Sequence, residues 1–340
     1  MARYPDGEAR AWALAELAGC CGCVMPTFTS DVRSLNEVAI RHDVRQEKAL
    51  GMRAVLVVAE GGTTVEEFNR FTDVVVEEAG TDLVVVVQAS QPTWAEMVAT
   101  VVHGAAAGAE LVLPSYPLTY HPRTLDELYC DTRAFIEQCP IGVMLFAMDQ
   151  WNFSRLHPAA FPLQLLERLV RDCPNLAAIK NEIGLPYAGG LVEVFERFAG
   201  RVLVTDPMEY NAPLWVRHYG MRFMGTSNYE AMGASVPTML RLLSEPGTWD
   251  EGMALYWEMS PVRRANSVVV SPIVGATSLV PRVMWRYQGW LLGCNGGPLR
   301  SPQQRINAAQ MAQLRAAASA AGLAVTPDPD ELFWVGRNPR

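Results

Sequence analysis

The stretch Leu83-Val-Val-Val-Val-Gln-Ala89 is a short, almost continuous run of apolar residues. Such runs are typical of parallel strands, because helices cover both faces of a parallel sheet. Seven further runs of this kind occur along the chain, and segments long enough for a helix separate them. In chain order, the eight predicted strands are residues 22–27, 54–60, 83–89, 110–115, 142–146, 176–180, 201–206 and 222–226.

Eight strand–helix units in succession predict an α/β protein, specifically a closed (β/α)8 TIM barrel. An open, doubly wound sheet is the alternative, but no Gly-x-Gly-x-x-Gly follows the first strand to support dinucleotide binding. After Thr226 the pattern is purely helical. We therefore expect a lead-in at 1–19, a barrel at 20–234 and a helical C-terminal extension at 235–340 packed on the barrel. The apolar tail at 332–335 should dock on a neighbouring surface.

The composition excludes several classes of function. The 340 residues carry a net charge of −8, so a basic surface for nucleic acid is not expected. No apolar run reaches the ~20 residues that a membrane span needs, and the polar N-terminus does not resemble a signal peptide. We therefore expect a cytoplasmic protein. Cys20-Cys21-Gly-Cys23 lacks a second ligand pair at zinc spacing, so we expect reduced core thiols and neither a metal nor another cofactor.

Lys180 is the candidate catalytic residue. The chain has only two lysines, Lys48 in a charged helical segment and Lys180 at the end of the sixth predicted strand. Active sites of (β/α)8 barrels lie at the carboxyl ends of the strands. An apolar barrel mouth disfavours an ammonium, and a free amine forms a Schiff base with a ketone or aldehyde. The alternative is a lysine whose head group simply reaches solvent.

The order of motifs resembles the dihydrodipicolinate synthase / N-acetylneuraminate lyase family over roughly residues 20 to 320. The motifs that carry the resemblance are Met25-Pro-Thr27, the strand Ala177-Ala-Ile-Lys180, the Gly-rich stretch 220–228 and Gly293-Cys-Asn-Gly-Gly-Pro-Leu-Arg300-Ser-Pro302. The resemblance implies a Schiff-base lysine at Lys180, no cofactor, and assembly as a homodimer or homotetramer. The chain length and Phe146-Ala-Met are most similar to the hydratase-aldolases, which cleave benzylidenepyruvates.

Two departures from the family pattern affect the expected chemistry. The family's Gly-Thr-Thr-Gly-Glu binds the pyruvate carboxylate, whereas this chain has Glu60-Gly61-Gly62-Thr63. A carboxylate at Glu60 would repel a substrate carboxylate unless it is protonated or turned away. The family's proton-relay tyrosine aligns with Phe146, which cannot transfer a proton. The standard relay is therefore not expected here.

Two residues are candidate replacements for the relay. Glu60 is a candidate base, with a solvated or salt-bridged acid as its alternative. Tyr116 follows the fourth predicted strand, in the loop from which the family's assisting tyrosine crosses a subunit interface. The remaining candidates lie at or near strand ends and would bind substrate: Thr27, Gly61, Gly62, Thr63, Phe146, Asp206, Gly225, Thr226 and Asn228.

These residues predict a Schiff-base lysine-dependent lyase or aldolase. It would make or break a C–C bond next to the carbonyl of a small oxo acid or aldehyde, on a substrate unusual for the family. A hydratase or dehydratase using Lys180 is one alternative. A catalytically inactive barrel that binds a ligand is the other.

Overall fold

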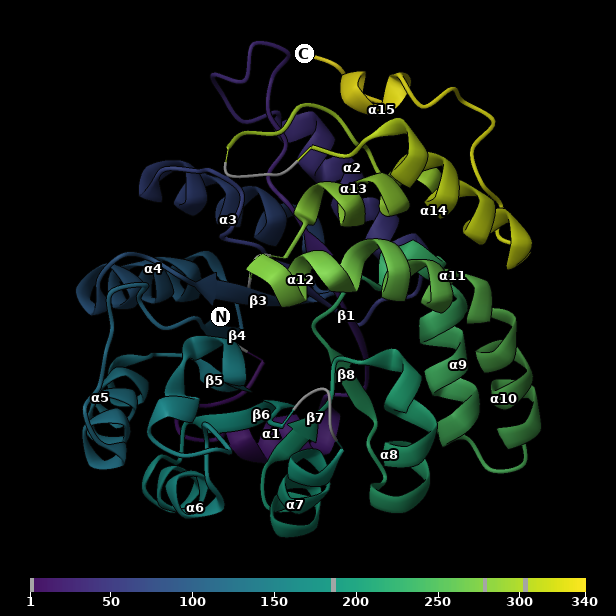
Figure 1. The fold of residues 1–340 in the computed structure, drawn as a ribbon. Helices are drawn as coiled ribbons and strands as arrows, with labels where there is room; N and C mark the ends of the chain where they lie inside the picture. The colour runs from purple at the N-terminus through teal and green to yellow at the C-terminus, as the bar shows by residue number, and fades with distance from the viewer. Residues whose placement is uncertain (1–2, 185–187, 278–279, 302–304) are drawn as a thin grey trace. The chain divides into compact units, whose positions relative to one another are not determined.

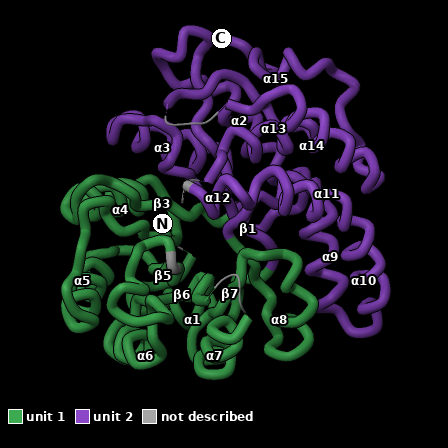
Figure 2. The backbone as a smooth tube through the Cα atoms, in the orientation of Figure 1, with its two compact units in different colours: residues 1–18, 84–225 green, residues 19–83, 226–340 purple. Residues whose placement is uncertain are grey.

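The computed structural model describes residues 3–184, 188–277, 280–301 and 305–340. Within these ranges the chain divides into two compact units, shown in Figure 2. Unit 1 comprises residues 1–18 and 84–225, and unit 2 comprises residues 19–83 and 226–340. The barrel and extension boundaries expected from the sequence remain a prediction.

The strands of the described chain form an eight-stranded sheet in the order β7-β6-β5-β4-β3-β2-β1-β8 (Figure 1). The pairs β1–β2, β3–β4, β4–β5, β5–β6 and β6–β7 are parallel. This order confirms the predicted (β/α)8 barrel with a helical C-terminal extension. The strands are β1 (Gly19–Val24), β2 (Ala54–Val57), β3 (Val84–Ala89), β4 (Leu111–Pro114), β5 (Gly142–Met148), β6 (Leu176–Glu182), β7 (Leu203–Thr205) and β8 (Phe223–Gly225).

Unit 1 contains β3 to β8, and its helices α4 to α8 lie outside these strands (Figure 1). Its strands are buried almost throughout, as their apolar sequences predicted. Threonine N-caps at Thr93 and Thr124 begin α4 and α5, because each hydroxyl accepts an otherwise unpaired helical N–H. The helices are α1 (Ala9–Glu16), α4 (Trp94–Ala107), α5 (Leu125–Gln138), α6 (Leu163–Asp172), α7 (Gly189–Phe198) and α8 (Ala212–Tyr219), with short 3₁₀ turns η1 (Asp149–Trp151), η2 (Phe153–Arg155) and η3 (Glu209–Asn211).

The N-terminal segment packs against the amino ends of the central strands. Arg10 in α1 donates hydrogen bonds to the carbonyls of Leu176 (2.8 Å) and Cys173 (2.5 Å). The Tyr4 hydroxyl accepts the Gly142 N–H over 2.7 Å. These contacts satisfy backbone groups where β5 and β6 begin, at the opposite end of the strands from Lys180.

Unit 2 contains β1, β2 and the C-terminal helices. The expected docking of the apolar tail is confirmed, because Phe333 is fully buried with its ring 5.3 Å from Tyr287 and 5.9 Å from Trp290. The elements are α2 (Glu37–Ala49), α3 (Val65–Ala79), η4 (Tyr229–Met232), α9 (Ser235–Ser244), α10 (Trp249–Glu258), α11 (Ser260–Ala265), a π-helical turn η5 (Asn266–Val270), α12 (Ser271–Thr277), α13 (Arg282–Leu291), α14 (Ala308–Ala320) and α15 (Leu332–Val335).

Prolines account for two of the differences between predicted and observed element bounds. The first strand ends at Val24 rather than at 27, and Pro26 has no N–H with which to continue a strand ladder. The helix expected over 249–266 is interrupted after Glu258, and Pro261 occupies the first turn of α11. Two other expected helix starts, at residues 279 and 304, lie outside the described residues.

Among the described residues, no helix combines the length and the apolar character needed to cross a membrane.

Truncating Phe333 tests whether the C-terminal tail contributes to stability. We expect Phe333→Ala to lower the free energy of unfolding by about 3–5 kcal/mol, because it removes a fully buried aromatic ring. Leu332→Ala is the matched control, since Leu332 is 45% exposed and should change stability by about 0.5 kcal/mol or less. Urea unfolding followed by circular dichroism measures both. Equal effects of the two substitutions would contradict a docked tail.

Candidate active site

Lys180 lies near the carboxyl end of β6 and is buried, with 4% of its surface exposed. Its Nζ donates a hydrogen bond to Oε1 of Glu182 over 2.6 Å. The same Nζ lies 3.5 Å from the ring centroid of Phe146, and the pairing of β5 with β6 sets Phe146 opposite Lys180. The amine is therefore held between a carboxylate and the face of an aromatic ring.

Glu182 is a candidate functional residue that the sequence interpretation missed. The sixth strand was expected to end at Lys180, whereas β6 continues to Glu182. Side chains two residues apart on a strand point to the same face, which brings the carboxylate to the amine. Its side chain is 11% exposed, so the ion pair is shielded from bulk water. The i, i+2 spacing was the signal that could have found it.

Phe146 stands where the family's relay tyrosine was expected, and its surroundings are aromatic. The Trp151 ring meets the Phe146 ring edge-on at 5.5 Å between centroids. Trp151 Nε1 also donates to the Phe146 carbonyl over 2.9 Å, which ties the η1 turn to the end of β5. Phe146 therefore supplies an apolar, cation-attracting face and no exchangeable proton.

Tyr116 is buried in an aromatic cluster after β4. Its hydroxyl shares a 2.7 Å hydrogen bond with Oγ1 of Thr132 in α5. Its ring stacks on Tyr120 at 5.6 Å and meets Phe153 edge-on at 4.8 Å. Burial raises the pKa of Tyr116 above the ordinary value, although the Thr132 hydrogen bond opposes this shift. Aromatic packing and the hydrogen bond to Thr132 satisfy the ring and the hydroxyl of Tyr116. Its role in a proton relay remains a prediction.

Asp206 follows β7 and is fully buried. Its carboxylate accepts hydrogen bonds from the Met208 N–H (2.8 Å), Asn211 Nδ2 (2.8 Å) and Trp215 Nε1 (2.6 Å). Burial raises the pKa of Asp206 to about 6, the three hydrogen bonds oppose this shift, and the nearby charge of Glu182 adds to it. The carboxylate is thus held by the segment that follows β7 and by α8.

Gly225, the last residue of β8, also lies in unit 1. Its N–H donates over 3.1 Å to Oγ1 of Thr205, and Thr205 pairs with Lys180 across β6 and β7. Five predicted site residues therefore belong to unit 1: Tyr116, Phe146, Lys180, Asp206 and Gly225. Tyr116 lies in the aromatic cluster described above.

Glu60 lies in unit 2 and forms an ion pair with Arg282 of α13. Arg282 Nη2 and Nε donate to the same carboxylate oxygen over 2.5 and 3.1 Å. The arginine side chain is 8% exposed and the glutamate side chain is 36% exposed. The Arg282 guanidinium also lies 4.6 Å from the centroid of the Trp285 ring. This contact corresponds to the salt-bridged alternative predicted for Glu60.

The glycines after Glu60 are fixed by close packing. A Cβ on Gly61 would lie 2.0 Å from Pro26, and Gly62 has a φ of +75° with the Ser301 carbonyl 2.3 Å from the position of a Cβ. Only glycine fits these two positions. Thr63 immediately precedes the N-cap Thr64 of α3. These residues lie in unit 2 and there shape the turn between β2 and α3.

Three further predicted residues lie in unit 2, and two of them, Thr27 and Asn228, have polar partners within it. The buried Thr27 hydroxyl accepts a hydrogen bond from Arg286 Nη2. Asn228 Nδ2 donates to Gln288 Oε1 over 2.9 Å. Thr226 is buried, with 6% of its surface exposed. The site roles assigned to all these residues remain predictions.

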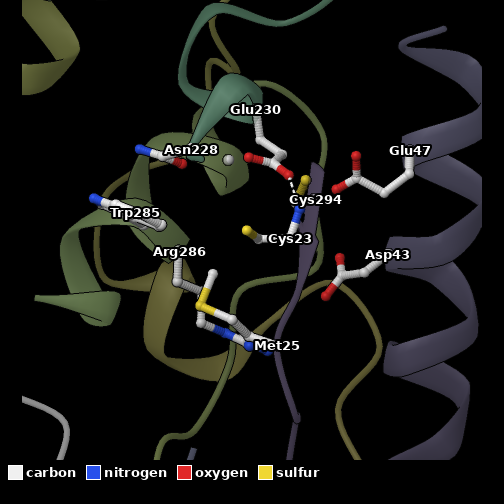
Figure 3. A pocket seen from close by; sticks show the side chains of 10 residues that line it. Cys23, Met25, Asp43, Glu47, Asn228, Glu230, Trp285, Arg286 and Cys294 are labelled. Atoms are coloured by element: carbon white, nitrogen blue, oxygen red, sulfur yellow. Dashed lines mark hydrogen bonds between the residues drawn. The ribbon is translucent and has the colours of Figure 1, made fainter. Parts of the chain in front are cut away.

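A small cavity of about 20 Å³ lies in unit 2 between β1, α2, α13 and η4 (Figure 3). This volume corresponds to about one water molecule. Sequence interpretation did not single out its three buried acids, Asp43, Glu47 and Glu230. Among the described residues, no three His, Cys, Asp or Glu side chains are arranged to hold a metal ion. The cavity is lined by Cys23, Met25, Asp43, Glu47, Asn228, Glu230, Trp285, Arg286, Gly289 and Cys294.

Glu47 and Glu230 approach each other above Gly22 of β1. A Cβ on Gly22 would lie 2.2 Å from Oε2 of Glu47 and 2.6 Å from Oε1 of Glu230. Burial raises the pKa of Glu47 well above its ordinary value, and the charge of Glu230 adds to the shift. Burial raises the pKa of Glu230 as well, and the Cys23 N–H, which donates to Glu230 Oε1 over 2.5 Å, opposes that shift. Both carboxyl groups are therefore harder to ionise here than in water.

Two curated relatives resemble the chain in sequence, and both are 4-hydroxy-tetrahydrodipicolinate synthases. The protein from Hyphomonas neptunium is 26% identical over 302 residues, which cover 85% of this chain and 94% of the relative. The protein from Chlorobium phaeobacteroides is 25% identical over 190 residues, which cover 55% of this chain and 60% of the relative. The latter alignment thus spans less than two thirds of that relative. No protein-family model matches the chain.

Solved structures share the fold. The N-acetylneuraminate lyase of Proteus mirabilis has a TM-score of 0.73 at 17% sequence identity, over 90% of this chain and 99% of that chain. The chain therefore resembles the dihydrodipicolinate synthase / N-acetylneuraminate lyase family in sequence and in fold, which confirms the resemblance predicted from its motifs.

The Glu47–Glu230 pair generates a prediction about pH. Because burial raises the pKa of folded Glu47, its contribution to stability is complete below the unfolded pKa and is lost as the pH rises through the folded pKa. Glu47→Gln keeps a hydrogen-bond donor and has no proton to lose. We expect the free energy of unfolding of this variant to equal that of the wild type at about pH 4 and to exceed it at about pH 8.

Urea unfolding at both pH values measures the difference. Glu258→Gln is the matched control, because Glu258 is an exposed acid at the end of α10. A Glu47→Gln variant that is less stable than the wild type at the higher pH would contradict the raised pKa of Glu47.

Proposed function

We propose that the protein is a lyase of the class I aldolase type that uses Lys180 as a Schiff-base nucleophile. It makes or breaks a C–C bond next to the carbonyl carbon of a small oxo acid or aldehyde. The observation that carries the proposal is the position of Lys180, a buried lysine near the carboxyl end of a barrel strand. The names of the similar proteins, a synthase and a lyase, support the same class of chemistry.

The surroundings of Lys180 suit a Schiff-base reaction. An amine attacks a carbonyl only after it has lost its proton, and the Glu182 carboxylate lies 2.6 Å away to accept it. The imine that forms regains a positive charge when protonated, and the Phe146 ring lies 3.5 Å from the nitrogen. An aromatic face attracts such a cation. The protonated imine then accepts electrons from the adjacent C–C bond.

The substrate is proposed to differ from that of the relatives. Phe146 replaces a polar tyrosine with an apolar ring, beside the Trp151 ring. This supports a substrate with an apolar or aromatic part, as in the hydratase-aldolases, and hydration of a double bond through the same imine is the related alternative. Glu60 binds Arg282, which neutralises its charge and favours a structural role over that of a base.

A second candidate function is a barrel that binds a ligand without catalysis. The Lys180–Glu182 ion pair is the observation that favours it, because an ammonium held by a buried carboxylate is not a nucleophile. The cytoplasmic location and the homodimer or homotetramer expected from the resemblance remain predictions.

Reductive trapping separates these candidates. We expect that incubation with pyruvate followed by borohydride leaves a covalent adduct on Lys180, detected by mass spectrometry of peptides. Lys180→Arg should abolish the adduct, because a guanidinium does not form the imine. Lys48→Arg is the matched control, since Lys48 is the other lysine of the chain and pairs with Asp82 over 2.8 Å.

The trapping experiment is repeated with other 2-oxo acids and with aldehydes. An adduct that persists in Lys180→Arg would show non-specific labelling. If no carbonyl compound, pyruvate included, labels Lys180 in the wild type, the lyase proposal is wrong.

A further inference from the structure

We propose that Glu182 is the acid–base residue of the Lys180 reaction and takes the place of the family's relay tyrosine. This inference rests on the proposed Schiff-base function. It concerns a residue that none of the family motifs includes, and it follows from the contacts at the end of β6.

The geometry places one carboxylate oxygen at the reacting nitrogen. Oε1 of Glu182 lies 2.6 Å from Nζ of Lys180, which is within the distance for direct proton transfer. The two side chains are 11% and 5% exposed, so bulk water does not readily replace the carboxylate as proton acceptor. Burial also strengthens the interaction between the two groups.

The backbone holds Glu182 in this position. The intervening residue, Asn181, is fully buried on the opposite face of the strand and donates from Nδ2 to the Leu191 carbonyl of α7 over 3.2 Å. Its Oδ1 accepts the Ile183 N–H over 3.4 Å. The register with β5 continues to the end of both strands, where Met148 pairs with Glu182. The carboxylate is thus carried by a paired strand and not by a loose loop.

The neighbouring side chains of unit 1 are less suited to exchange protons with Lys180. Phe146 carries no exchangeable proton. The Asp206 carboxylate already accepts three N–H hydrogen bonds, from Met208, Asn211 and Trp215. The Tyr116 hydroxyl is engaged with Thr132, and burial raises its pKa. Glu182 is the acid whose oxygen contacts Nζ directly.

The protons balance through Glu182 in each step. The ammonium of Lys180 gives one proton to the carboxylate, and the free amine forms a C–N bond with the carbonyl carbon while the carbonyl oxygen takes that proton. Glu182 then accepts a second proton from the nitrogen and gives it to the hydroxyl group. Water leaves, and a protonated imine and a carboxylate remain.

The same carboxylate serves the carbon chemistry. In synthesis, it removes a proton from the carbon next to the imine, and the C–H electrons form a neutral enamine. The enamine carbon then bonds to an aldehyde carbon, and the Glu182 carboxyl group protonates the aldehyde oxygen as its double bond breaks. Cleavage follows the same steps in reverse, with Glu182 accepting the hydroxyl proton.

A simple counter-ion would behave differently. If Glu182 only neutralised the ammonium, its removal would leave proton transfer unaffected or would free the amine and accelerate the reaction. If Glu182 moves protons, its removal should slow proton transfer at carbon, while the amine can still form the imine. Trapping of the imine and hydrogen exchange at the adjacent carbon therefore report separately on the two roles.

The experiment uses pyruvate as the probe with the full-length protein in D2O. Exchange of the methyl hydrogens is followed by proton NMR, and borohydride trapping on Lys180 is measured in parallel. We expect Glu182→Gln to lower the exchange rate by ~10²–10⁴-fold and to retain the Lys180 adduct. Glu182→Asp should recover part of the exchange, because it keeps the carboxylate. Glu193→Gln, the same substitution at an exposed position of α7, should exchange like the wild type.

Three outcomes would overturn the inference. Exchange in Glu182→Gln at the wild-type rate would exclude the acid–base role, and faster exchange with faster trapping would assign Glu182 as a restraining counter-ion. Absence of an adduct in the wild type would refute the proposed function itself, and the inference with it. Circular dichroism establishes that each variant is folded. If Glu182→Gln does not fold, the Glu182→Asp variant tests the inference instead. Its shorter side chain moves the carboxylate away from Nζ, so exchange at the wild-type rate would contradict a role that depends on the 2.6 Å contact.

Discussion

The hydrogen-bonded ion pair between Lys180 and Glu182 is the interaction on which the candidate chemistry depends. Two charges are buried at the end of one strand, and each would be costly to leave there alone. The pair exists because β6 extends two residues beyond Lys180 and because its register with β5 sets the Phe146 ring beside the amine. The two-residue alternation of side chains along a paired strand thus brings the Lys180 amine and the Glu182 carboxylate to the same face.

The two departures from the family pattern have different physical consequences. Phe146 removes a proton-carrying hydroxyl and replaces it with an apolar surface that still favours a cation beside it. Glu60 introduces a charge where the family has a hydroxyl, and Arg282 neutralises that charge through two hydrogen bonds to one oxygen. The change to Phe146 removes a group that could transfer a proton near Lys180. The change to Glu60 leaves the charge balanced within unit 2, so it does not require different chemistry.

The cavity of unit 2 holds a second group of buried acids, Asp43, Glu47 and Glu230. Glu47 and Glu230 lie close together in the buried interior, and Gly22 provides the space that their oxygens occupy. Burial raises the pKa of both carboxyl groups, so each is harder to ionise here than in water. Asp43 has its own partners, since it accepts the Asn295 N–H over 2.6 Å and lies near the charge of Arg286. We interpret this cluster as a determinant of stability and of its dependence on pH.

The sequence alone predicted the fold class, and it singled out Lys180 as the candidate nucleophile. Continuous apolar runs indicate strands that are buried on both faces of a sheet. A lysine at a strand end, in a chain whose other strong bases are almost all arginines, indicates a site that uses an amine. The apolar pattern predicted the ends of elements less well. Strand β1 and helix α10, for example, end earlier than expected, shortly before Pro26 and Pro261. The partners of the charged groups were decided by the tertiary structure, because the Glu60–Arg282 and Glu47–Glu230 pairs join segments that are remote in the chain. Glu182 combines both kinds of information. Its two-residue spacing from Lys180 is visible in the sequence, but its carboxylate reaches the amine only because the paired strand β6 continues to Glu182.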